Sequence, residues 1–287
     1  MNEFDTDSVF INVGKFIETN IGFDSWNKIS DEDKIKYINK ISPIIEEYVN
    51  NKVYREVQRK HYNSTETEFR IKFKQEIIAK SILFVKKKKY SSWNVSEEGV
   101  PTDKIKTTGL EIVRSDTPEH VRPMLKDIMT MILKGSTDKE ISDKIHKCKK
   151  ELQNIKPEAI ATNIGIHDTK KYISADGTFL KGTPMHVKGV GNYRKLLKIL
   201  SLDKTYEDIM EGAKAKVVYV KKNAFGFESI TFNRWPKEFD SVLQIDYPKQ
   251  IDKTFLNKCD MLLEVLGKKH LITSNDAQRS LNTFFIT

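Results

Sequence analysis

The chain contains Asp5-Thr6-Asp7-Ser8 close to its start, followed directly by the strand-like stretch Val9-Phe10-Ile11-Asn12-Val13. Two carboxylates one residue apart are typical of a β-hairpin tip, where strand alternation points Asp5 and Asp7 to one side and Thr6 to the other. Neighbouring carboxylates repel each other unless a divalent cation lies between them. The pattern therefore predicts a Mg²⁺ ligand pair, with an ordinary Asp-rich turn as the alternative.

The overall composition favours a polyanionic partner. The 287 residues, 38% of them hydrophobic, are enough for one large or two moderate domains, and the net charge of +9 favours nucleic acid first and an acidic membrane surface second. Cys148 and Cys259 lack metal-ligand spacing, so we expect free thiols in a reducing cytosol. No apolar run can span a bilayer and no basic start resembles a signal peptide, so we expect a soluble intracellular protein without a membrane partner.

Strand and helix patterns alternate in the first third of the chain. After the strand at 8–13, apolar residues recur at helical spacing, and Ser30 or Asp31 can cap this helix. Pro43 is expected to kink the helix or to divide it in two. Three further segments are predicted here: a half-buried strand at 65–73, a strand at 82–85 and a loop at 91–103.

Helix patterns dominate the next part. Thr117-Pro118-Glu119 is typical of a helix start with proline at the first helical position, and Thr137 or Asp138 begins the following helix. Mixed short elements follow, and the end of the chain is polar until its last apolar residues. The prediction is an α+β fold in three parts, with bounds at 1–103, 104–266 and 267–287.

Three segments occur in an order that is specific as a set: Phe4-Asp5-Thr6-Asp7-Ser8, Lys87-Lys88-Lys89-Tyr90, and residues 104–118 with Gly109-Leu110-Glu111. They resemble the (Y/F)-G-D-T-D-S palm hairpin, the K-K-R-Y element and the thumb entry of a family B DNA polymerase. The similarity is greatest to the replicative enzyme of T-even-type tailed phages. It covers essentially the whole chain, with later landmarks such as His186-Val187-Lys188-Gly189. It implies part of an antiparallel palm sheet with helices, then a mainly helical thumb and a short tail.

The resemblance implies extension of a primer 3′-hydroxyl with dNTPs by two-metal phosphoryl transfer. Asp7 would be the ligand shared by two Mg²⁺ ions, with Asp5 beside it near the primer terminus. Glu76 would support the ions, or would be a surface glutamate at a strand end. Phe4 stands where the family usually has glycine, so we expect a local rearrangement there.

Several motifs of the family have no counterpart in the sequence: the exonuclease, the first palm segment D-x-x-S-L-Y-P, which carries the other shared ligand, and the fingers helix K-x-x-x-N-S-x-Y-G. The acidic turn also follows only a short first strand, and a hairpin with a truncated strand is marginal by itself. We therefore expect an amino-terminal partner subunit that supplies these parts, and the resemblance places both chains in the cytoplasm of a bacterial host.

Basic residues after the acidic turn are expected to follow the primer–template duplex. Lys87, Lys88 and Tyr90 would contact primer phosphates and minor-groove acceptors, which tests base-pair geometry and not sequence. A solvated lysine cluster is the alternative, as is a hydrogen-bonded core histidine for His186. The other DNA-binding residues expected are Lys104, Lys106, Gly109, Arg114, His186 and Lys188.

The end of the chain fits the sliding-clamp peptide Q-x-x-(L/I/M)-x-x-F-F, with Gln278, Leu281, Phe284 and Phe285 at the defining positions. One helical turn would bring the three apolar side chains to one side as a hydrophobic plug. We expect this tail to bind a sliding clamp. Packing of a terminal helix on its own thumb is the alternative.

Two other functions remain open. Asp5-Thr6-Asp7-Ser8-Val9 roughly matches the D-x-D-x-(T/V) opening of haloacid-dehalogenase-type phosphatases, but the hydrophobic strand before that motif and the late acidic pair do not appear. The second alternative is a non-catalytic remnant that binds DNA and a clamp, because all the motifs present also serve binding.

Overall fold

The computed structural model describes residues 3–4, 8–61, 71–110, 116–174 and 177–272. The fold is α+β, as predicted, and every sheet in the described residues is antiparallel. The chain divides into two compact units, Met1–Thr108 and Gly109–Thr287. Among the described helices, none combines the length and apolar character needed to cross a membrane.

Unit 1 contains two small sheets. Strands β1 (Glu3–Phe4) and β2 (Val9–Phe10) pair with each other, and β3 (Ile77–Lys86), β4 (Lys89–Glu97) and β5 (Val100–Thr108) form a meander. The strand predicted at 8–13 is therefore shorter, and the one at 82–85 is part of β3.

The loop predicted at 91–103 is wrong, because this segment forms most of the β4–β5 hairpin. Glu98 and Gly99 connect the strands with φ angles of 50° and 81°. Positive φ at both central residues is the geometry that matches the twist of a two-residue hairpin. Residue types that are common in turns lie within strand β4 and form no turn there. Ser91, Ser92, Asn94 and Ser96 are all buried within the sheet region.

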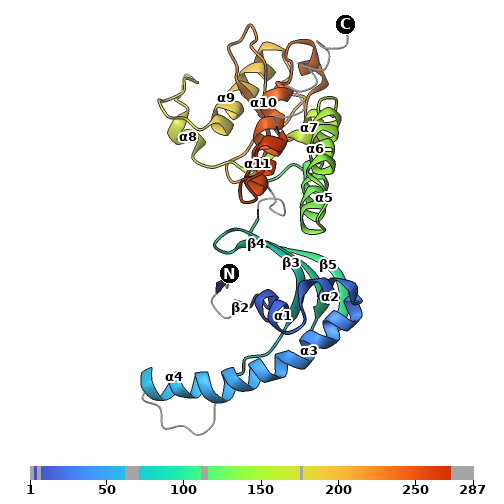
Figure 1. Cartoon of the computed structure of the whole chain (residues 1–287). Helices are drawn as coiled ribbons and strands as arrows, with labels where there is room; N and C mark the ends of the chain where they lie inside the picture. Colours follow the sequence, from blue (N-terminus) through green and yellow to red (C-terminus); the bar gives the residue numbers. More distant parts are fainter. Residues whose placement is uncertain (1–2, 5–7, 62–70, 111–115, 175–176, 273–287) are drawn as a thin grey trace, which may run out of the picture. The chain divides into compact units, whose positions relative to one another are not determined.

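The helices of unit 1 are α1 (Gly14–Asn20), α2 (Phe23–Lys28) and a long rod visible in Figure 1, formed by α3 (Asp31–Tyr48), the π-helical η1 (Val49–Val53) and α4 (Tyr54–His61). Ser30 caps α3, since its hydroxyl accepts a hydrogen bond of 3.1 Å from the backbone N–H of Asp33. Pro43 lies inside α3 and does not divide it.

A strand is predicted at 65–73, and the structure describes residues 71–73 of it. This part of the prediction is wrong, because residues 71–76 form no strand. Their backbone pairs with side chains of the helical rod. Asn50 donates to the Phe73 carbonyl at 2.9 Å and accepts from its N–H at 2.7 Å, while a Glu46 carboxylate oxygen accepts from the Gln75 N–H at 2.7 Å. These bonds satisfy polar backbone groups that would otherwise need a neighbouring strand.

One layer of unit 2 is made of helices. Its helices are α5 (Val121–Leu133), α6 (Asp138–Leu152), α10 (Tyr247–Ile251), the π-helical η4 (Asp252–Leu256) and α11 (Asn257–Glu264). The predicted start of α5 at Thr117–Glu119 is a few residues early, because Pro118 instead precedes the helix and accepts from the Val121 N–H. Thr137 caps α6 in a reciprocal capping box with Glu140.

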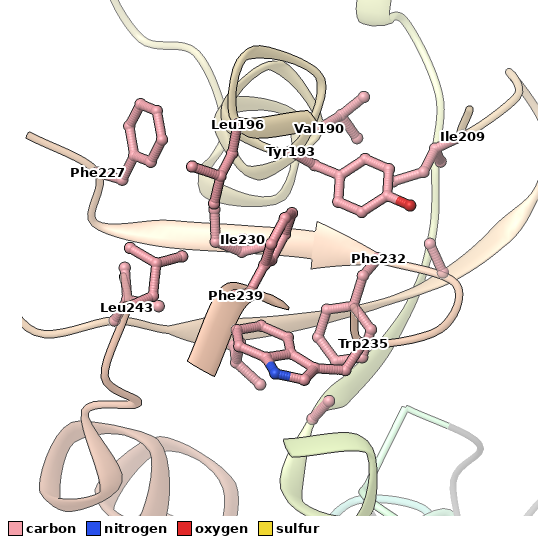
Figure 2. Packing of buried hydrophobic residues seen from close by; sticks show 14 of the residues in the cluster. Val190, Tyr193, Leu196, Ile209, Phe227, Ile230, Phe232, Trp235, Phe239 and Leu243 are labelled. Carbon is pink, nitrogen blue, oxygen red and sulfur yellow. The ribbon is translucent and has the colours of Figure 1, made fainter. Parts of the chain in front are cut away.

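The second layer of unit 2 combines a small sheet with further helices: α7 (Pro157–Ile160), β6 (Thr162–Gly165), α8 (Thr169–Tyr172), α9 (Met185–Ile199), β7 (Lys214–Tyr219), β8 (Ser229–Phe232) and the 3₁₀ helix η3 (Lys237–Ser241). Tyr193, Phe232, Trp235 and Phe239 lie together in its core, with ring centroids 5.1–5.9 Å apart and steep interplanar angles (Figure 2). Such edge-on packing is favourable for aromatic rings.

The folded part of unit 2 continues past Gly267, where the sequence predicts the tail. Leu271 is buried, and its carbonyl accepts a hydrogen bond of 2.9 Å from the Ser142 hydroxyl of α6. Lys268 forms an ion pair of 2.6 Å with Asp138 at the start of the same helix. The contacts of Lys268 and Leu271 therefore hold this part of the chain against α6.

Candidate functional site

The acidic pair Asp5 and Asp7 lies outside the described residues, but the strands on either side of it are described. Glu3 pairs with Phe10 and Phe4 with Val9, so the strands that flank Asp5 and Asp7 in the sequence form an antiparallel pair. No group of three or more His, Cys, Asp or Glu side chains that could hold a metal gathers among the described residues. The oxygen-only donors of Asp5 and Asp7 are the type that Mg²⁺ prefers.

Strand β2 contacts the β3–β4 hairpin through three aromatic rings. The Phe10 ring centroid lies 5.5 Å from that of Phe84 and 5.2 Å from that of Tyr90, in edge-on geometry. Phe84 and Tyr90 are themselves 5.7 Å apart and form a cross-strand pair. Strand β2 therefore packs on the turn end of the hairpin that carries the lysine run.

The lysine run forms the tip of this hairpin. Lys86 pairs with Lys89, and Lys87 and Lys88 make the two-residue turn between them. The turn residues are exposed, and Lys88 adopts a left-handed φ of 61°. A register shift between Phe84 and Lys86 places a bulge just before the turn, and bulges bend a strand and re-aim its side chains. The hairpin thus projects two cations from a rigid sheet.

Two further predicted DNA contacts, Lys104 and Lys106, lie on β5 opposite Asn94 and Ser92. Both lysines are exposed, and the Lys104 ammonium is 3.7 Å from a Glu97 carboxylate oxygen. A hydrogen bond from the Asn94 side chain holds the pKa of Glu97 below its usual value, and the two lysines act in the same direction. Glu97 therefore stays ionised and partly neutralises this cationic edge.

Glu76 is exposed and lies just before β3, at the opposite end of that strand from the lysine hairpin. Its backbone carbonyl accepts a hydrogen bond of 2.7 Å from the Glu98 N–H. Among the described residues, Glu76 belongs to no group of three or more His, Cys, Asp or Glu side chains that could hold a metal. Its role with the metal ions stays a prediction.

The predicted contacts of unit 2 are partly described. Gly109 follows β5 with a left-handed φ of 65°, whereas Arg114 lies outside the described residues. His186 and Lys188 lie in the first turn of α9, where the Thr231 hydroxyl donates to the His186 carbonyl at 2.7 Å. Burial lowers the pKa of His186, and nearby His167 lowers it further. This direction favours the neutral imidazole, which contacts a phosphate as a hydrogen-bond donor.

The predicted clamp-binding residues Gln278, Leu281, Phe284 and Phe285 lie outside the described residues. Sequence reasoning also missed two residues near the site, Phe10 and Phe84, which it treated only as strand positions. The available signal was the aromatic residue on each side of the lysine run, at Phe84 and Tyr90. That signal does not identify Phe10 as their partner, because the contact joins segments far apart in the sequence.

The comparisons with known proteins agree with this arrangement. The family model for DNA polymerase family B matches residues 5–176, which is more than half of the chain and runs from the acidic turn through the lysine hairpin into unit 2. No curated protein matches the chain. Enzymes of this family are DNA-directed DNA polymerases, so a domain of the family implies binding of DNA and dNTPs and the use of Mg²⁺. This membership decides against the phosphatase alternative. The chain belongs to DNA polymerase family B.

Proposed function

We propose that this chain is the palm and thumb subunit of a split DNA polymerase of the T-even phage type. It extends a primer 3′-hydroxyl with dNTPs together with an amino-terminal partner chain, in the cytoplasm of a bacterial host. The observation that carries the proposal is the family match that begins at the acidic turn, joined to the packing of β2 on the lysine hairpin. The proposed parts are the palm at 1–103, the thumb at 104–266 and the tail at 267–287.

In this proposal Asp7 and Asp5 are the catalytic carboxylates of the chain. Two bound Mg²⁺ ions would supply activation of the 3′-hydroxyl and neutralisation of the triphosphate. Asp7 is the shared ligand, and Asp5 lies nearer the primer terminus. The other shared ligand, the fingers and the exonuclease come from the partner, since the sequence contains neither D-x-x-S-L-Y-P nor K-x-x-x-N-S-x-Y-G.

Exposed apolar surface in unit 1 supports a polypeptide partner. Among its described hydrophobic residues, only Ile17 and Leu83 are fully buried, whereas Ile11, Phe16 and Phe23 are each about half exposed, at 46%, 46% and 45%. Large apolar side chains left exposed in one unit favour a surface that another chain covers. The two-residue strands β1 and β2 are also too short to be stable as an isolated hairpin.

The duplex is held by the basic residues of both units. Lys87 and Lys88 project from the hairpin tip, with Tyr90 next to the turn and Lys104 and Lys106 on β5. The thumb contributes further contacts through residues at its entry and in the first turn of α9, and the tail binds the sliding clamp. The proposed thumb contacts are Gly109, Arg114, His186 and Lys188, and the clamp contacts are Gln278, Leu281, Phe284 and Phe285.

Primer extension tests the proposal directly. The purified chain alone should extend no primer, whereas a mixture with its amino-terminal partner should do so in the presence of Mg²⁺. In the mixture, Asp7→Ala should abolish extension and Asp5→Ala should weaken it less, because only Asp7 bridges both ions. Asp143→Ala, an exposed residue of α6, is the matched control and should extend normally.

Three results would count against the proposal. Robust incorporation by the single chain would contradict the split enzyme. A greater loss from Asp5→Ala than from Asp7→Ala would reverse the assigned metal roles. A mixture that binds primer–template and clamp without any extension would identify the non-catalytic remnant.

A further inference from the structure

Three aromatic side chains from three different strands form a closed cluster, hereafter the aromatic cluster: Phe10 of β2, Phe84 of β3 and Tyr90 of β4. Phe10 meets the other two rings at interplanar angles of 71° and 72°, and the Phe84 and Tyr90 rings are tilted by 49°. Edge-on ring pairs have a preferred geometry and contribute more than their buried area alone. The cluster therefore prefers one arrangement of the three strands.

The cluster lies between the two segments that the proposed chemistry has to align. Phe10 follows Asp7 after two intervening residues, so the ring is close in the chain to the acidic turn. Phe84 and Tyr90 form the cross-strand pair next to the lysine turn, which Lys86 and Lys89 close. Each of the two segments thus contributes directly to the same cluster.

The short pair of strands β1 and β2 depends on such side-chain packing for its position. Strands β1 and β2 share only the pairs Glu3↔Phe10 and Phe4↔Val9. A ladder of this length does not hold its own position, because isolated hairpins are marginal even when they are longer. A reacting group displaced by about 1 Å can cost about 10²-fold in rate. The three rings therefore pack at a place where even a small displacement would lower the reaction rate.

We propose that the aromatic cluster is a positioning device that holds the metal-binding turn in register with the primer-contacting lysine hairpin. Phe10 and Phe84 are positioning residues, because they act through Asp5, Asp7 and the lysines and not on the substrate. The proposal rests on the proposed function for its consequence in catalysis. The packing contact between β2 and the hairpin, hereafter the link, can be tested independently of the proposed function.

Hydrogen exchange in the intact chain without DNA tests the link. Hydrogen-bonded and non-hydrogen-bonded pairs alternate in an antiparallel ladder, so one of the Val9 and Phe10 amides donates to β1. Phe84→Leu should accelerate exchange of that amide by about 3- to 10-fold, the range expected when edge-on ring packing is removed. Leu83→Val is the matched control: its side chain is buried, and neighbouring residues of a strand point to opposite faces. That control should leave exchange at Val9 and Phe10 unchanged. Equal effects of the two variants, or no effect of Phe84→Leu, would overturn the proposal.

Single-nucleotide incorporation by the mixture with the partner chain tests the consequence. Phe10→Leu and Phe84→Leu should each lower the maximal rate by about 10- to 100-fold and raise the Mg²⁺ concentration for half-maximal rate. The Kd for primer–template should stay within about twofold, and Phe10→Tyr should restore the rate because it keeps the ring. Loss of DNA affinity in proportion to rate, or failure of Phe10→Tyr to rescue, would show a merely structural role and overturn the proposal. A wild-type mixture that extends no primer would instead refute the proposed function, and hydrogen exchange would still decide the link.

Discussion

Gly189 in α9 shows how a single missing side chain decides the packing of a helix. A Cβ atom at this position would clash with the Thr231 hydroxyl and lie 2.8 Å from the Thr231 backbone nitrogen in β8. The Thr231 hydroxyl is itself held by the His186 carbonyl, so the strand cannot yield freely. Glycine therefore lets α9 lie directly on β8, which brings the first turn of α9 with His186 and Lys188 to a fixed place in unit 2.

Gly189→Ala should destabilise unit 2 even though alanine is the better helix former. Helix propensity favours alanine by about 1 kcal/mol, whereas overpacking against a strand backbone costs about 1–3 kcal/mol and adds a shift of α9. We expect a net loss of about 0–2 kcal/mol in the free energy of unfolding, measured by urea denaturation of the intact chain. Lys198→Ala, at an exposed position of the same helix, should change it by less than about 0.5 kcal/mol. A more stable Gly189→Ala protein would contradict this packing.

The β3–β4 hairpin is the element that turns a lysine run into a directed surface. A run of four lysines in a flexible loop would be an ordinary solvated cluster, but here Lys86 and Lys89 are paired and only Lys87 and Lys88 form the turn. The sheet fixes the direction of the turn, and the aromatic cluster fixes its base. The loss of backbone conformational entropy on binding a phosphate is then smaller than for a lysine on a mobile segment.

The double variant Lys87→Ala/Lys88→Ala should weaken binding of primer–template of every sequence, because phosphate contacts carry no sequence information. The slope of log Kd against log salt concentration should decrease by about one unit for each phosphate that the variant no longer neutralises. The double variant Lys40→Ala/Lys139→Ala removes the same charge from exposed helix positions and should leave the slope unchanged. Equal slopes in the two variants would show that the lysine turn is a solvated surface without phosphate contacts.

The two units of the molecule differ sharply in how much core they contain. In the described residues, the hydrophobic side chains that are fully buried lie almost entirely in unit 2, with Ile17 and Leu83 as those of unit 1. Unit 2 also fastens the chain up to Leu271 against α6, through Ser142 and the ion pair of Lys268 with Asp138. The proposed clamp peptide therefore follows an anchored segment of a unit that carries its own core.

Deleting Gln278–Thr287 should leave the thermal stability of unit 2 and distributive extension by the mixture intact, because the deleted residues follow the anchored segment. The same deletion should abolish stimulation by the clamp. Tethering makes binding of the clamp intramolecular and can raise avidity by about 10²–10⁴-fold. The measurement is product length in a single encounter with clamp present, with Leu281→Ala and Phe285→Ala expected to reproduce most of the effect. Products of unchanged length would show that the tail is a packing element.

Local features of the sequence determined the family of this protein and the starts of two of its helices. The order of the acidic turn, the lysine run and the thumb entry indicated the family, and helix caps at Ser30 and Thr137 are made by side chains within one turn of the helix they begin. Such features depend on neighbours in the chain, so they can be recognised without knowledge of the fold.

Only the tertiary structure decided which distant segments meet. The serine-rich β4 has the composition of a loop, and it is a strand because its backbone pairs with β3 on one side and β5 on the other. Residues 71–76 form no strand because Asn50 and Glu46 of the helical rod satisfy their backbone. The packing of Phe10 on Phe84 and Tyr90 joins residues more than seventy positions apart in the sequence. Composition and periodicity cannot reveal these partners, because pairing and burial depend on where the rest of the chain lies.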